Sequence, residues 1–131
     1  MAQKKLLPSY ADSTVLFSNG EDSPRGFLER CLSKIEECEA DIQAFVTLSP
    51  FERARALADA ATARWKAGQQ LSMIDGMPVG IKDVIETEDM PTKMGSPLSE
   101  GYFGGRDAAS VKALRQAGAI ILGKTVTTEF A

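Results

Sequence analysis

The sequence predicts an α/β fold, and three observations lead to this prediction. Residues 79–85 and 119–122 are rich in aliphatic and β-branched side chains, as strands are. Residues 107–118 between them have helical spacing, so we expect a crossover helix that joins two parallel strands. The run at 119–122 is apolar without interruption, which is typical of a strand covered on both faces.

Composition narrows the possible functions. The 131 residues are 44% hydrophobic and 25% charged, which is typical of one globular domain. The formal net charge is −3, so we expect neither a nucleic-acid partner nor an anionic membrane surface. The chain contains no histidine, which excludes Ser-His-Asp and Cys-His catalysis and imidazole metal sites.

The N-terminal region carries no targeting signal that we recognise. Residues 1–22 are expected to be a lead-in with at most one short element. Leu6 and Leu7 end at Pro8, too short a stretch for a signal peptide, and no apolar run approaches the roughly 18 residues of a membrane span. These features predict a soluble, cytoplasmic protein.

Two cysteines, Cys31 and Cys38, fall within a predicted helix. On one helix face they would lie about 10 Å apart, at roughly 1.5 Å rise per residue. That distance is too long for a disulfide. We interpret both as small apolar core residues of a reduced, cytosolic protein.

Two helices are expected upstream of the strands. Ser23-Pro24 predicts the start of the first, which continues to about residue 39. Residues 42–48 favour a short strand or an extended link. Residues 49–52 form a capping box that predicts the start of the second helix, which Gly68 ends. Its basic residues could form a patch, but acidic residues interrupt them, so a solvated helix face is the better interpretation. The basic residues are Arg53, Arg55, Arg64 and Lys66, and the acidic ones Glu52 and Asp59.

The region after residue 85 is a long polar loop, from about residue 86 to 106. A loop of that length without elements of its own is usually functional or disordered. Asp107 is expected to cap the third helix, and Gly118 to end it.

Residues 118–125 match the written pattern of a phosphate-binding loop, and we reject that interpretation. A phosphate-binding loop needs free backbone N–H groups in a flexible turn between a strand and a helix. Here the middle residues are themselves the predicted strand. Lys124 is therefore expected to be structural or neutral, and to serve as a control in tests of other lysines.

Lys82 is the other lysine of interest. Alternation places it on one face of the strand with Gly80 and Val84. It must either reach solvent, paired with Asp83 or Glu86, or be removed from water. A desolvated lysine loses its proton more readily and can act as a general base, a role that no histidine can fill here.

The C-terminal half of the chain has a family resemblance. From residue 76 onward, the sequences GMPVGIKDVIETEDMPTKMGSP and GRDAASVKALRQAGAIILGKTVTTEFA closely resemble the amidase signature family. The resemblance implies the N-terminal part of an α/β/α fold, with helices followed by strands of a mixed sheet that is incomplete in this chain. Residues 1–131 would then be an incomplete N-terminal portion of one domain. Its parts are a lead-in (1–22), two helices (23–68) and the start of the core sheet with the catalytic-lysine strand (71–131).

The resemblance also implies a site. The family uses a Ser–Ser–Lys triad that includes a serine before a cis peptide bond, and Lys82 matches the family lysine. Met94, Gly95 and Ser96 resemble the segment that approaches the substrate, although Ser96 could instead be only a turn serine before Pro97. Both family serines lie in a Gly/Ser-rich stretch, and none of the ten serines here has that context. We therefore expect a fragment that carries the base, lacks both serines and is inactive alone.

The implied substrate is a carboxylic amide, with no metal or organic cofactor and a possible homodimer in the full-length protein. The related amidotransferase A subunits, which take part in tRNA-dependent transamidation, usually have asparagine where this chain has Val84 and Val126. That difference favours a free-standing amide hydrolase. A non-catalytic remnant or binding fragment is the remaining alternative.

Overall fold

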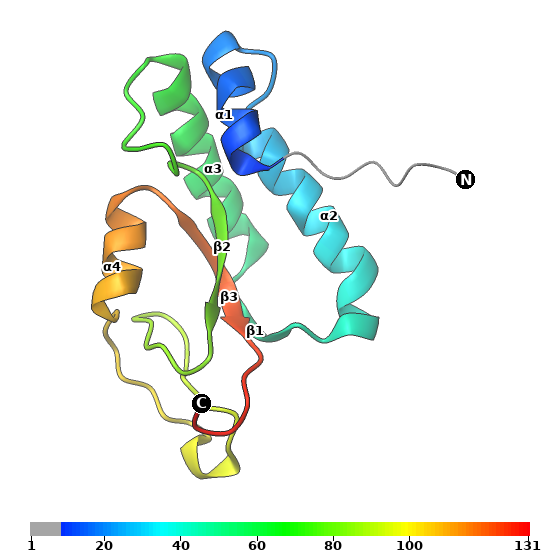
Figure 1. The fold of residues 1–131 in the computed structure, drawn as a ribbon, viewed down its shortest axis with the longest axis vertical. Helices are drawn as coiled ribbons and strands as arrows, with labels where there is room; N and C mark the ends of the chain where they lie inside the picture. The colour runs from blue at the N-terminus through cyan, green and yellow to red at the C-terminus, as the bar shows by residue number, and fades with distance from the viewer. Residues whose placement is uncertain (1–8) are drawn as a thin grey trace.

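The computed structural model describes residues 9–131, so the prediction about Leu6, Leu7 and Pro8 lies outside the described residues. Within that range the expected single short element of the lead-in is a ten-residue helix. In chain order the elements are α1 (Tyr10–Asn19), α2 (Pro24–Ile42), β1 (Phe45–Leu48), α3 (Phe51–Lys66), β2 (Pro78–Lys82), the 3₁₀ helix η1 (Pro97–Ser99), α4 (Ala109–Gln116) and β3 (Ile120–Thr125) (Figure 1).

The sheet confirms the predicted α/β class. Its strand order is β1-β3-β2, with β2 parallel and β1 antiparallel to β3. Helix α4 is the crossover between the two parallel strands, as expected. β2 ends at Lys82 rather than at residue 85, because the Ile85 N–H donates to the Lys82 carbonyl and closes a turn. β3 extends to Thr125, beyond the predicted 119–122, because strands pair with it on both sides.

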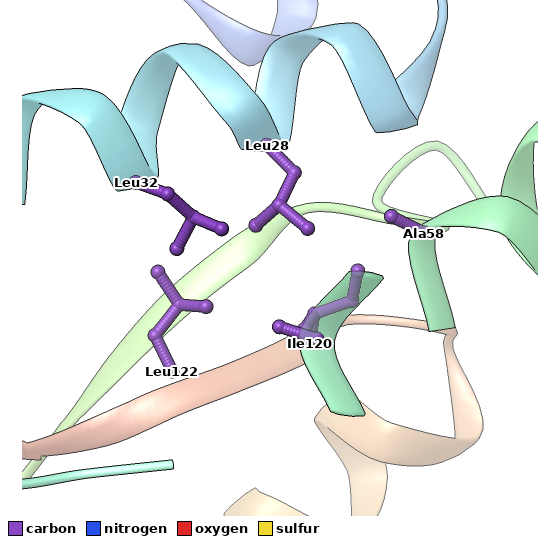
Figure 2. Packing of buried hydrophobic residues seen from close by; sticks show 6 residues of the cluster. Leu28, Leu32, Ala58, Ile120 and Leu122 are labelled. Carbon is purple, nitrogen blue, oxygen red and sulfur yellow. The ribbon is translucent and has the colours of Figure 1, made fainter. Parts of the chain in front are cut away.

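Helices cover both faces of the sheet, which explains the uninterrupted apolar strand. On one face Leu28 and Leu32 of α2 pack with Ala58 of α3 against Ile120 and Leu122 of β3 (Figure 2). The opposite face is covered by α4. There the cluster consists of Ile81, Met90, Val111 and Ile121. Alternating residues of β3 thus enter different cores, as the pleat of a strand requires.

The start of α2 is confirmed. The Ser23 side chain accepts a hydrogen bond from the Gly26 N–H, and Pro24 occupies the first helical position, where its missing N–H has no cost. Cys31 and Cys38 are half-buried free thiols on this helix. Burial raises the pKa of the Cys31 thiol, which disfavours the reactive thiolate.

Two predicted helix caps are wrong. The residue that caps α3 is Pro50, which provides no side-chain acceptor, while the backbone N–H of Ser49 donates to the Leu122 carbonyl. The residue that caps α4 is Ala108. The Asp107 carboxylate instead accepts from the Glu88 N–H and pairs with Arg115. In both cases long-range partners, which local sequence does not reveal, hold the expected capping residue.

The arginines of α3 are engaged in ion pairs. Arg53 pairs with Asp89 at 2.6 Å, and Arg55 pairs with Glu29 at 2.9 Å. The acidic partners belong to the loop after β2 and to α2. Acidic side chains thus neutralise these two arginines, as the preferred interpretation of a solvated helix face expects.

Helix α1 packs through an aromatic cluster. Tyr10 and Phe17 of α1 contact Phe27 and Trp65 edge to face, with ring centroids 5.0–5.6 Å apart. The Tyr10 hydroxyl and the Trp65 indole N–H both donate to the Asp75 carbonyl. The cluster thus fixes the turn that leads into β2.

Gly118, which ends α4 as predicted, permits a close packing contact. Its φ is +93°, and a Cβ there would lie 2.2 Å from Asp75 Oδ1. We predict that Gly118→Ala destabilises the chain by about 1–3 kcal/mol through overpacking, in addition to the strain of a positive φ. Gly68→Ala is the matched control, since Gly68 also follows a helix with φ +65°, but a Cβ there would meet no atom within 4 Å. Limited proteolysis of the purified chain measures both, and equal cleavage rates would contradict the prediction.

Candidate functional site around Lys82

Lys82 is the last residue of β2 and is exposed. It pairs in register with Thr125 of β3, and its neighbours Ile81 and Asp83 are both buried. The predicted ion pairs of Lys82 are not formed. Asp83 pairs instead with Lys124, and Glu86 pairs with Arg106. Lys82 thus projects from a fixed strand end and makes no ion pair with any residue in the range 9–131.

The segment Met94-Gly95-Ser96 lies beside the end of β2. The Met94 N–H donates to the Asp83 carbonyl at 2.9 Å, so the segment contacts the residue directly after Lys82. Gly95 has φ +65°, and a Cβ there would lie 2.9 Å from the Thr127 carbonyl oxygen. A side chain at this position would therefore separate the segment from the chain that follows β3. The end of the strand that carries Lys82 and the Met94-Gly95-Ser96 segment are therefore adjacent in space.

Ser96 was interpreted either as a substrate-proximal residue or as a turn serine before Pro97, and its contacts agree with the second. It caps η1 by accepting from the Leu98 N–H, and Pro97 follows as the first residue of that helix. The Ser96 side chain is buried, and its hydroxyl donates to Glu129 Oε1 at 2.7 Å. This carboxylate contact is one that the sequence did not indicate.

A cavity of about 260 Å³ opens next to this segment. Its lining is both charged and apolar, and it includes Ser96 and Gly95 but not Lys82. The remaining lining residues are Val46, Asp83, Lys93, Pro97 and Glu100. The cavity therefore brings the predicted substrate-proximal segment together with the buried carboxylate that follows Lys82.

Lys124 has the structural role that was one of the two expected for it, but its contacts make it unsuitable as a control. The rejection of a phosphate-binding loop is confirmed, because residues 120–125 form β3. The Lys124 side chain, however, is fully buried, and its ammonium lies 3.2 Å from Asp83 Oδ1. It also donates to Thr92 Oγ1 at 2.8 Å. A residue that contacts the neighbour of Lys82 cannot serve as a neutral control.

Residues 9–131 contain no group of three or more histidine, cysteine, aspartate or glutamate side chains arranged to hold a metal ion. None of the helices in this range is long and apolar enough to cross a membrane.

Comparison with known proteins identifies the class to which this chain belongs. The family model for amidases matches residues 27–131. The chain therefore belongs to the amidase family, the amidase signature enzymes.

Two of its relatives by sequence carry the same protein name. The chain is 42% identical over 104 residues to the A subunit of the glutamyl-tRNA(Gln) amidotransferase of Anaeromyxobacter sp. strain K, covering 79% of this chain and 21% of that protein. It is 42% identical over 112 residues to the protein of the same name from Chloroflexus aggregans, covering 86% and 23%. The chain thus spans less than a quarter of the length of these relatives.

Solved structures confirm the fold. The peptide amidase of Stenotrophomonas maltophilia superposes with a TM-score of 0.84 at 27% identity, over 98% of this chain and 26% of that one. An inhibitor-bound vestigial complex linked to the origins of an s-triazine catabolic enzyme gives a TM-score of 0.85 at 31% identity, over 95% and 27%. The three-stranded sheet is therefore an incomplete part of the amidase sheet.

Proposed function

We propose that this chain is the N-terminal part of an amide hydrolase in which Lys82 is the general base. The observation that carries the proposal is the environment of Lys82. Its side chain is exposed at the end of β2, while both nearby carboxylates, Asp83 and Glu86, pair with other cations. Lys82 is thus free of competing ion pairs among residues 9–131, and segments that complete the sheet at this end would remove it from water, which favours the neutral amine that a general base requires.

The proposed mechanism is acyl transfer through a covalent ester. Lys82 Nζ takes a proton from a serine that precedes a cis peptide bond, and that serine takes the proton of a second, nucleophilic serine. The nucleophile attacks the amide carbonyl, and the proton returns to the leaving amine as the C–N bond breaks. Water then hydrolyses the ester and regenerates the serine. Both serines would come from a Gly/Ser-rich segment outside residues 1–131, and no metal or organic cofactor takes part.

The incomplete sheet supports this proposal. β2 is an edge strand that pairs only with β3 among the described residues, and its outer edge has hydrogen-bonding groups for a further strand. Lys82 ends this edge strand. A polypeptide segment that extended the sheet there could bring serine hydroxyls toward Lys82.

The test uses a longer polypeptide, in which residues 1–131 are continued by the Gly/Ser-rich segment and the remaining strands of an amidase. An anilide and a methylamide with the same acyl group are hydrolysed in the presence of hydroxylamine. If both form one acyl-enzyme, the ratio of hydroxamate to free acid is the same for the two substrates. Different ratios would contradict a common covalent intermediate.

A second candidate function is that of the A subunit in a tRNA-dependent amidotransferase. It is favoured by the name that the first relatives share. The presence of Val84 and Val126 in place of asparagine argues against it. An assay with glutamine, glutamyl-tRNA and partner subunits distinguishes the two functions. Amidated tRNA would establish the transferase, and hydrolysis of simple amides without tRNA would establish the hydrolase.

A further inference from the structure

Lys124 is a buried cation that the proposed mechanism does not use. Its side chain has 0% relative exposure in the middle layer of the fold. The ammonium donates to Thr92 Oγ1 at 2.8 Å and to the Pro91 carbonyl at 3.2 Å, and it lies 3.2 Å from Asp83 Oδ1. Two hydrogen-bond acceptors and one carboxylate charge thus surround the ammonium.

Asp83 is the anionic partner, and it directly follows Lys82. It is 1% exposed, and its Oδ1 accepts no hydrogen bond from the described residues, so the charge of Lys124 compensates it. Its Oδ2 accepts from the Lys93 N–H at 3.2 Å. Its backbone N–H donates to Thr125 of β3, and its carbonyl accepts from Met94. Asp83 therefore joins β2, β3 and the 91–94 segment at one point.

This junction has a consequence for Lys82. Lys82 is the terminal residue of β2, so the position of the chain on its C-terminal side depends on what holds Asp83. Asp83 is held by a charge pair that is removed from water. Separating the pair would leave a buried charge without compensation, which is strongly unfavourable.

We propose that the buried Asp83–Lys124 ion pair positions Lys82 for proton transfer. Asp83 and Lys124 are positioning residues and do not contact the reacting atoms. The proposal rests on the proposed function of Lys82 as the base. It also predicts that the pair fixes the Met94-Gly95-Ser96 segment relative to Lys82, because both attach to Asp83.

The test measures kcat and KM of Asp83→Asn and Lys124→Met in the longer polypeptide, corrected for the folded fraction. A misplaced base should lower kcat by up to about 10²-fold while KM changes little, since the base acts in the transition state. Asp75→Asn is the matched control. Asp75 is 0% exposed and pairs with Arg64 at 2.6 Å, but it precedes β2 at the opposite end from Lys82. We expect its kcat to stay within about threefold of the parent, because the strand end that carries the base is untouched.

A second comparison separates positioning from a general loss of structure. In a Lys82→Ala background, Asp83→Asn should lower the residual activity no further, because the group that it positions is already absent. A purely structural role would lower the activity equally in both backgrounds, and that result would overturn the inference. A kcat for Asp83→Asn within about threefold of the parent would also overturn the inference. An equal loss of kcat in Asp75→Asn would do the same.

A milder variant covers the case in which Asp83→Asn does not fold. Thr92→Val removes one acceptor of Lys124 and keeps the β-branched shape. Its kcat is compared in the parent and in the Lys82→Ala background, as for Asp83→Asn. If Lys82→Ala itself retains activity, the proposed function fails. If Lys82→Ala is inactive while the folded pair variants keep their kcat, only the positioning role fails.

Discussion

Lys82→Ala in the longer polypeptide is expected to lower kcat by at least about 10²-fold, the lower range for a positioned acid–base group. KM should change little, because the base stabilises the transition state rather than the bound substrate. Lys82→Arg is expected to fail as well, since a guanidinium remains protonated and cannot accept a proton. Initial rates with a chromogenic anilide measure both variants.

The control for Lys82 is Lys112→Ala. Lys112 is exposed on α4, where it lies outside the cavity near Ser96. It replaces Lys124, whose buried contact with Asp83 makes it unsuitable. We expect the kcat of Lys112→Ala to stay within a fewfold of the parent. Full activity in Lys82→Arg, or an equal loss in Lys112→Ala, would contradict the assignment of Lys82 as the base.

Local patterns predicted much of the fold. Ser23-Pro24 determines the start of α2 through contacts within four residues, so the sequence is sufficient to locate it. The parallel pairing of β2 and β3 follows from the helix between them. The apolar continuity of residues 119–122 correctly indicated a central strand, because a strand with helices on both faces needs apolar residues at every position.

The features that local patterns did not predict depend on contacts between distant residues. Asp107 has the residue type of a helix cap, but it pairs with Arg115 and accepts from Glu88 instead. Lys124 and Asp83 are 41 positions apart by residue number, and only the parallel register of β2 and β3 brings them together. Lys82 could be proposed as the base because it lies in a family motif. The pair that holds its neighbour could not, because neither partner has a local signature.

The contrast between the two strand-end lysines follows from their positions in the sheet. Lys124 lies in the central strand, where removal from water requires an anionic partner. Lys82 lies at the end of the edge strand, where its side chain reaches the surface. The central lysine is therefore fixed by its charge, whereas the edge lysine is exposed and makes no ion pair with residues 9–131.

The polypeptide of residues 1–131 alone is expected to hydrolyse no amide measurably. Ser96, the serine of the segment beside the end of β2, is buried, caps η1 and donates to Glu129, so its hydroxyl is already engaged. Without a nucleophile the acyl-enzyme route is closed, and a lysine alone is only a weak catalyst. Release of amine from a panel of anilides and aliphatic amides measures the activity. The same chain with Lys82→Ala sets the baseline. Turnover above that baseline would contradict the prediction, and its loss in Ser96→Ala would then identify Ser96 as the nucleophile.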